Sequence, residues 1–225
     1  NPSSSSGEFA SHIVNKAFDQ SRNAVFGADC SGGTFYGLLL HNVFSLKAEY
    51  GSEVLRALLS LKETGCVEKI GVSVYSAEDI DFVLAMFLPD IIQLPISIVD
   101  QRLIKSGHLE KLRNLGVEIH ARSLFLQGLL LMDLDSLPAG MEGVKENLRL
   151  FDDLTRKYGL SRLEACLAFA KDISEIDCAI VGVTSANEFE KISTAFRRVQ
   201  GINFDFRKFS WENHAHLNPA KWKID

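Results

Sequence analysis

The chain has 225 residues, of which 46% are hydrophobic, and its formal net charge at pH 7 is -5. This length and composition suffice for one large domain with a sizeable core, and we expect a single α/β domain over residues 1–225. Acidic and basic residues are interspersed, without the basic stripe that phosphate backbones require, which argues against a nucleic-acid partner. The chain has no apolar run of the roughly 18 residues that a membrane helix needs, so no membrane partner is expected.

The cysteines indicate the cellular compartment. They lie far apart and without CxxC spacing, at Cys30, Cys66, Cys166 and Cys178. This pattern favours free thiols in a reducing cytoplasm over a zinc site or a disulfide framework. The first residues have neither a basic start nor the apolar segment of a signal peptide. We therefore expect a soluble, cytoplasmic protein.

The N-terminal part begins with a polar run and continues into a helix. Residues 1–7, NPSSSSG, are typical of a loop, a linker or a cut end. Over residues 8–26 the apolar side chains recur at helical spacing, which predicts an amphipathic helix.

Five short apolar runs predict strands, and segments of helical periodicity separate them. The predicted strands are Phe35–His41, Glu68–Val74, Asp90–Ser97, Val117–Ser123 and Asp177–Val183. Ser76, Ser161 and Ser185 have the spacing of helix N-caps. Residues 201–225 have no clear period and are expected to form a C-terminal tail.

Strands that alternate with helices predict βαβ units and a parallel sheet. A closed (β/α)8 barrel, or TIM barrel, needs eight strands and about 250 residues. In that case the chain supplies five of the eight strand–helix units and is truncated, with about three units before residue 1. A doubly wound sheet needs only five strands, but no GxGxxG follows the first one.

His41 stands where the first apolar run stops. The carboxyl end of a buried parallel strand is where α/β barrels hold their chemistry, so His41 is a candidate catalytic residue. A partly buried structural histidine with satisfied hydrogen bonds is the alternative.

Polar residues also fall near the ends of other strands, at Ser73, Gln93 and Ser123. In a parallel sheet they would converge on one rim, where buried polar groups need partners and a ligand could be one. The run Gly182-Val183-Thr184-Ser185 precedes a helix, and its backbone N–H groups suit an anion. Plain helix capping explains this run equally well.

A metal site is not expected. His214 and His216 have a spacing that a metal could use in a strand, but no third ligand lies nearby in the sequence.

Six segments, in order, resemble the aldo-keto reductase family, and in particular a branch found among bacterial surface-polysaccharide and sugar-modifying gene products. They are YGLLLHN, VEKIGVSVYS, PDIIQLPISIVDQR, GVEIHARSLFLQGLLL, GLSRLEACLAF and CAIVGVTSANEFEKI. The resemblance implies a (β/α)8 barrel that binds an extended nicotinamide dinucleotide without a Rossmann motif. It also implies reduction of a small or sugar-like carbonyl substrate to an alcohol by hydride transfer. A non-catalytic relative that binds a cofactor or a sugar, or an inactive fragment, is the alternative.

The resemblance assigns roles to single residues. His41 matches the family's histidine, which orients the substrate oxygen. The family's catalytic Asp, Tyr and Lys belong to strands and loops that would lie before residue 1. Ser73 and Gln93 match positions that bind the nicotinamide carboxamide, whereas Val74 replaces a common Asn. Arg122 stands where many members stack an aromatic ring on the nicotinamide.

The remaining matches concern the phosphates of the cofactor. Ser123, Leu124, Gln127 and Gly128 match the loop that covers the pyrophosphate, and Gly182, Val183 and Ser185 keep the family's backbone pattern. Thr184 stands where members that prefer NADPH often carry a basic residue for the 2′-phosphate. The expected cofactor is therefore NADP or NAD; Thr184 argues against a preference for NADPH and leaves NADH open.

Overall fold

The computed structural model describes residues 2–27, 33–137, 142–199, 201–202, 205–211, 216–217 and 222. Cys30 and His214 lie outside these ranges. The chain divides into two compact units, residues 1–93 and 94–225. The single domain predicted over the whole chain stays a prediction.

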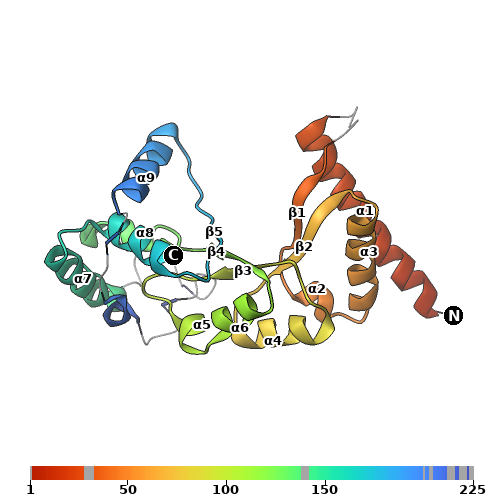
Figure 1. Cartoon of the computed structure of the whole chain (residues 1–225), viewed down its shortest axis with the longest axis horizontal. Coiled ribbons are helices and arrows are strands. Elements are labelled where there is room, and N and C mark those ends of the chain that lie inside the picture. Colours follow the sequence, from red (N-terminus) through yellow and green to blue (C-terminus); the bar gives the residue numbers. More distant parts are fainter. Residues whose placement is uncertain are drawn as a thin grey trace. The chain divides into compact units, whose positions relative to one another are not determined.

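The described residues form five strands, which follow one another in the sheet in chain order (Figure 1). They are β1 (Phe35–Leu40), β2 (Val67–Ser73), β3 (Ile91–Pro95), β4 (Glu118–Arg122) and β5 (Cys178–Ala179). The pairs β1–β2, β2–β3 and β4–β5 are parallel, which confirms the predicted α/β class. Pro95 ends β3, as a residue without a backbone N–H should.

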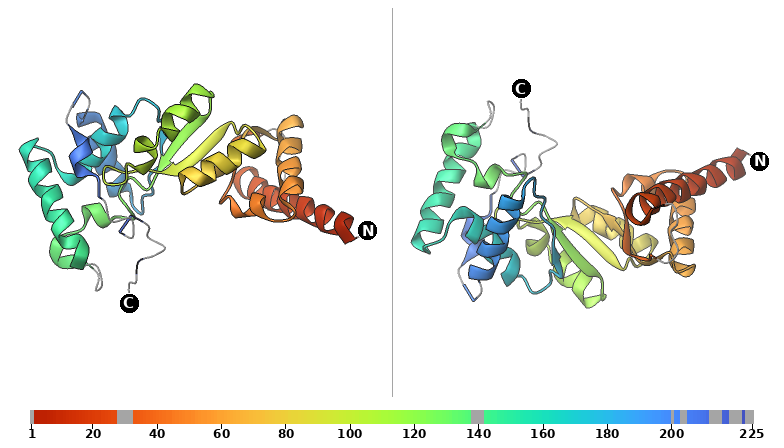
Figure 2. Two further views of the ribbon diagram at one scale, coloured as in Figure 1. Left: turned by 90° about the horizontal axis from the view of Figure 1, so that it is seen from below. Right: turned by 90° about the horizontal axis from the view of Figure 1, so that it is seen from above.

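The first unit opens with a long helix. The helices of this unit are α1 (Pro2–Phe26), α2 (Phe44–Lys47), α3 (Gly51–Glu63) and α4 (Ala77–Met86). Figure 2 shows α1, in red, beside α3 from two sides. Of the three interpretations of residues 1–7, the loop is wrong for residues 2–7, which are helical, and the linker or cut end stays a prediction. Pro2 occupies the first helical position, where its fixed φ and missing N–H are tolerated.

The register of β2 and β3 places polar residues together. Gly71 pairs with Ile91, and Ser73 pairs with Gln93. Parallel strands with both faces covered consist of apolar residues, and Val72, Ile91 and Ile92 are fully buried. Ser73 and Gln93 therefore stand beside each other where the apolar stretch ends.

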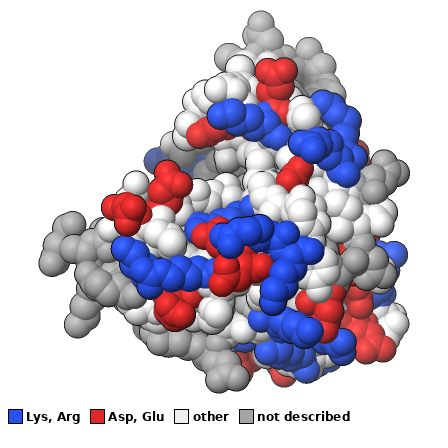
Figure 3. All heavy atoms as spheres, turned by 90° about the vertical axis from the view of Figure 1, so that its left-hand side faces the viewer, with Lys and Arg blue, Asp and Glu red and all other residues white. Residues whose placement is uncertain are grey.

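The second unit contains the remaining described helices. They are α5 (Arg102–Lys105), α6 (His108–Asn114), η1 (Leu129–Leu131), η2 (Leu134–Ser136), α7 (Glu142–Lys157), α8 (Arg162–Asp172), α9 (Ala186–Arg198) and η3 (Phe206–Phe209). Ser161 and Glu164 form the predicted capping box at the start of α8. Lys and Arg are interspersed with Asp and Glu on the face drawn in Figure 3. In α7, for example, Arg156 pairs with Asp153.

The fifth strand is shorter than predicted. Only Cys178 and Ala179 belong to β5, where they pair with His120 and Ala121, whereas the prediction extended to Val183. Both residues of β5 are exposed, so this segment lacks the cover on two faces that supports a long parallel strand. The run from Gly182 to Ser185 is consequently a loop that leads into α9.

The described part of the tail packs into the second unit. Phe209 makes an edge-to-face contact with Phe151 at 5.4 Å between ring centroids. The Gln101 side chain donates to the Phe206 carbonyl oxygen at 2.8 Å, and the Trp211 N–H donates to the Val99 carbonyl oxygen at 2.9 Å. These side-chain contacts and the backbone bond of Trp211 give structure to a segment that lacks any sequence period.

Two further observations concern the residues that the structure describes. None of their helices combines the length and the apolar character needed to cross a membrane. Cys66, Cys166 and Cys178 are free thiols, and burial raises the pKa of Cys166.

Candidate functional site

His41 follows β1 directly and is exposed. It forms no hydrogen bond with any residue in the described ranges. The alternative of a buried histidine with satisfied hydrogen bonds therefore does not describe it. An exposed imidazole at the end of a strand remains available to bind a ligand.

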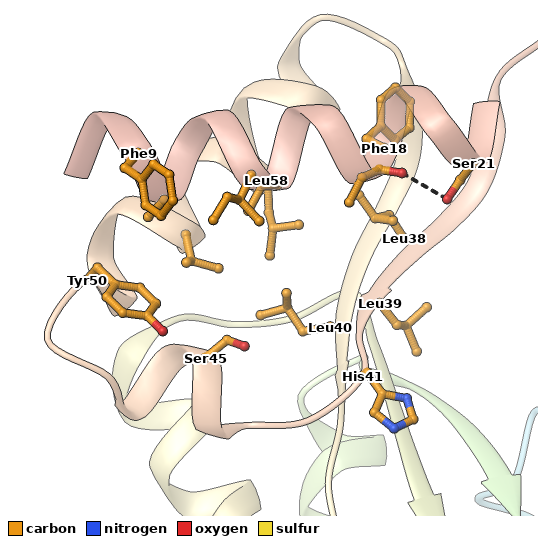
Figure 4. A pocket seen from close by; sticks show the side chains of 15 residues that line it. Phe9, Phe18, Ser21, Leu38, Leu39, Leu40, His41, Ser45, Tyr50 and Leu58 are labelled. Carbon is orange, nitrogen blue, oxygen red and sulfur yellow. Dashed lines mark hydrogen bonds between the residues drawn. The ribbon is translucent and has the colours of Figure 1, made fainter. Parts of the chain in front are cut away.

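A pocket of about 550 Å³ in the first unit has mainly apolar walls from α1, β1 and α3. His41 belongs to its rim, but Figure 4 shows the ring directed away from the other lining side chains. Phe9 and Ile13 border this pocket and are 64% and 49% exposed. The helical period of α1 was predicted, but the period alone did not show that these side chains border an open pocket. The ring of His41 thus does not point into this pocket.

Ser73 and Gln93 meet, as predicted from their positions at strand ends. The Ser73 hydroxyl donates to the Gln93 side-chain oxygen at 3.4 Å, and the Val74 N–H donates to the Gln93 backbone carbonyl at 2.8 Å. Ser73 is buried, with 5% of its surface exposed, and Gln93 is half-buried. A glutamine amide offers both donors and an acceptor, which suits another amide.

Arg122 and Ser123 open a sharply bent loop after β4. Ser123, Leu126 and Gln127 have φ angles of 64°, 48° and 53°, and Gly128 has a φ of 86°. The left-handed region is unfavourable for residues other than glycine, and such residues cluster at functional sites.

Internal hydrogen bonds hold this bent loop. The Leu126 N–H donates to the Ser123 carbonyl, and the Arg122 guanidinium donates to the Ser123 hydroxyl at 3.2 Å. Leu124 is buried, so its side chain packs in the core and only its backbone could meet a ligand. Gln127 is exposed, and the space beside the Cα of Gly128 is open. These features fit a loop that lies against a polar ligand.

The loop before α9 carries its own negative group. The Ser185 hydroxyl accepts from the Glu188 N–H at 3.2 Å, which confirms the predicted N-cap. The Glu188 carboxylate accepts from the Thr184 N–H at 2.6 Å and from the Thr184 hydroxyl at 2.9 Å. The hydrogen bond from the Thr184 backbone is the main reason why the pKa of Glu188 is lowered. Glu188 is the residue whose role at this loop the sequence interpretation missed, although its spacing from Ser185 is that of a capping box.

The backbone N–H of Thr184 thus already donates to the Glu188 carboxylate, while Gly182 and Val183 lie exposed on the same loop. Within the described ranges, no cluster of three or more His, Cys, Asp or Glu side chains could hold a metal ion.

The family model described as Aldo/keto reductase family matches residues 26–200. The chain belongs to this family. The polysaccharide-related branch stays a prediction. None of the curated proteins shows a significant sequence match to the chain.

Solved structures of the family share its fold. Aldo-keto reductase AKR11C1 from Bacillus halodurans, in the apo form, has a TM-score of 0.68 and 18% identity over 93% of this chain and 72% of that chain. Its holo form has a TM-score of 0.66 and 17% identity over 94% of this chain and 71% of that chain. A mutant of Gox0644 in complex with NADPH has a TM-score of 0.60 and 15% identity, over 88% of this chain and 65% of that chain. The chain therefore has part of the family's barrel fold, as predicted.

Proposed function

We propose that this chain is part of a cytoplasmic carbonyl reductase that uses a nicotinamide dinucleotide to convert an aldehyde, a ketone or a sugar-like carbonyl compound to an alcohol. The observation that carries the proposal is the Ser73–Gln93 pair, in a chain of the aldo-keto reductase family. When bound, the reduced nicotinamide would supply the hydride. The complex of Gox0644 with NADPH supports the choice of this cofactor class.

The Ser73–Gln93 pair would hold the nicotinamide carboxamide. Each side chain can form hydrogen bonds with an amide, and the buried Ser73 hydroxyl fixes the Gln93 side-chain oxygen. An amide held at a fixed angle determines which face of the nicotinamide ring is presented to the substrate.

Arg122 and the loop after it would bind the ring and the pyrophosphate. The planar guanidinium of Arg122 can stack on a ring, and its hydrogen bond to Ser123 limits its rotation. Ser123, Leu124, Gln127 and Gly128 would cover the pyrophosphate, with Leu124 contributing its backbone alone. The bent backbone of this loop suits that role.

The loop of Gly182, Val183, Thr184 and Ser185 would bind the adenosine half of the cofactor. Its position at the start of α9 gives it backbone donors and the positive end of the helix dipole. Whether this loop accepts a ribose with or without a phosphate depends on Glu188.

His41 would orient the substrate carbonyl. The ring is exposed and makes no hydrogen bond within the described ranges, so it can donate one to a carbonyl oxygen. The family's Asp, Tyr and Lys match no residue of this sequence, and the reduction step is proposed for a polypeptide that also contains them.

Titration of the protein with NADH and NADPH, followed by nucleotide fluorescence and calorimetry, tests the cofactor site. Replacing Gln93 with Ala should weaken binding about tenfold, the value of roughly one lost hydrogen bond. Gln20→Ala, on the exposed side of α1, is the matched control and should leave the affinity unchanged. Absence of binding, or equal affinities for both variants, would contradict the proposal.

His41→Ala separates substrate binding from cofactor binding. In a reductase that contains this chain, we expect NAD(P)H oxidation with an aldehyde to be lost while dinucleotide affinity is retained. Unchanged turnover would remove His41 from the reaction.

A further inference from the structure

We propose that Glu188 excludes a ribose phosphate from the loop before α9, so that the dinucleotide bound by this chain is NAD. This inference rests on the proposed function, which places the adenosine half of the cofactor at this loop. It adds a residue that determines specificity and that acts by charge.

The carboxylate of Glu188 already uses donors of the loop. Glu188 accepts from both the backbone N–H and the hydroxyl of Thr184, at 2.6 and 2.9 Å. A phosphate oxygen needs donors of this kind. A phosphate on the ribose would have to displace the carboxylate from Thr184 and then lie beside its negative charge.

The charges of the neighbouring residues also disfavour a phosphate. From Gly182 to Phe189 the loop and the first turn of α9 contain one acidic residue, Glu188, and no basic residue. Lys191 is the cation whose charge acts on Glu188, and it follows on the exposed part of α9. The charged side chain that the loop and this first turn contain is thus negative, which disfavours an anion there.

An unphosphorylated ribose carries two hydroxyl groups, and each can donate a hydrogen bond. An acidic side chain that accepts from a ribose hydroxyl is a general way in which NAD sites are built, whereas NADP sites use a cation. Glu188 is exposed and has a second carboxylate oxygen to offer to such a hydroxyl.

Glu188 also belongs to the cap of α9, and this role has to be separated from specificity. Glu188→Gln keeps a side-chain oxygen that can accept from Thr184 and removes only the charge. Glu190→Gln removes a charge two residues further along the helix and is the matched control. Both variants are compared with the unaltered protein by circular dichroism and thermal unfolding.

Affinities are measured by calorimetry for NADH and NADPH, and for the half-cofactors 5′-AMP and adenosine 2′,5′-bisphosphate. The half-cofactors test the loop independently of Ser73 and Gln93. We expect the unaltered protein to bind NADH and 5′-AMP at least tenfold more tightly than their phosphorylated counterparts. Glu188→Gln should reduce this ratio several-fold by strengthening binding of the phosphorylated ligands, and Glu190→Gln should leave the ratio unchanged.

Equal or tighter binding of NADPH by the unaltered protein would overturn the inference and leave the proposed function standing. A ratio that is the same in a folded Glu188→Gln variant would also overturn it. If no nucleotide binds, the proposed function fails, and the inference fails with it.

Discussion

Gly71 of β2 approaches Ile91 of β3 so closely that a Cβ on Gly71 would lie 2.2 Å from the Ile91 carbonyl oxygen. Real Cβ atoms do not come so near a backbone oxygen, so the two strands can pair at this distance only with glycine at position 71. The same register sets Ser73 against Gln93 two residues later. The Ser73–Gln93 pair, which is proposed to bind the cofactor, therefore depends on Gly71, a residue that has no side chain and cannot itself contact the cofactor through one.

Gly71→Ala should consequently lower the free energy of unfolding by about 2 kcal/mol or more, because the added methyl group forces β2 and β3 apart. Urea unfolding followed by circular dichroism measures the change. Gly182→Ala is the control, since no atom lies within 4 Å of a Cβ built there, and its effect should stay within about 0.5 kcal/mol. A loss no larger than that of the control would contradict the steric argument.

The cap of α8 should make stability depend on pH. The Ser161 N–H and hydroxyl donate to the Glu164 carboxylate at 2.9 and 2.8 Å. Mainly through the backbone bond, they lower the pKa of Glu164 from its ordinary value of 4.5. A carboxyl group whose pKa is lower in the folded state stabilises the fold above its unfolded pKa. This stability is lost as the pH falls through the folded pKa.

Ser161→Ala removes the hydroxyl and keeps the backbone N–H, so it should cost about 1 kcal/mol at pH 7 and flatten part of the decline of stability below about pH 4.5. Unfolding curves between pH 3 and 7 provide the measurement. Ser174→Ala, which removes an exposed hydroxyl bonded to Glu175, should shift the whole curve little and keep its slope. An unchanged slope for Ser161→Ala would show that the hydroxyl contributes nothing to the low pKa of Glu164 and that the backbone bond, which the variant keeps, accounts for it.

Arg162 joins α8 to α7 and to the segment before it. Its guanidinium pairs with both carboxylate oxygens of Asp152 and donates to the Met132 carbonyl at 2.7 Å. Only 13% of the Arg162 side chain is exposed, so Arg162→Met leaves a partly buried carboxylate without its cation. We expect a loss of about 2–3 kcal/mol in chemical denaturation.

The exposed pair of Arg156 and Asp153 provides the comparison for Arg162. Arg156→Met should cost less than about 0.5 kcal/mol, because exposed ion pairs contribute little. Similar losses for the two variants would mean that burial does not decide the contribution of Arg162.

Phe209 anchors the described part of the tail. It is buried against Phe151, and Phe209→Ala should cost about 3 kcal/mol and expose the tail to limited proteolysis. Phe189→Ala removes an aromatic side chain that is 63% exposed and should leave both stability and proteolysis unchanged. A tail equally resistant in both variants would argue against this anchoring.

The strands could be predicted where burial on two faces imposes an unbroken apolar run. Ile91 and Ile92 in β3 are examples, since both are fully buried. The prediction failed where that condition does not hold. The strand ends at Ala179 although the residues that follow are apolar, and Ile180 and Val183 are 38% and 42% exposed.

The part of the candidate site that lies at the ends of parallel strands could be predicted from the sequence. Ser73 and Gln93 meet because parallel neighbours bring equivalent ends together. The bond from Thr184 to Glu188 depends instead on the backbone conformation of a loop, and no sequence period reports that conformation. The bend after Arg122 was likewise hidden, because leucine and glutamine do not signal a positive φ.

That bend also affects the thermodynamics of any ligand that it touches. Residues in the left-handed region cost of order 1–3 kcal/mol each, and Ser123, Leu126 and Gln127 meet this cost within the folded protein itself. A ligand therefore meets a preorganised backbone and does not have to order a flexible one. Relaxing the strain, for instance with Gln127→Gly, would make the loop easier to form and poorer at holding what lies against it.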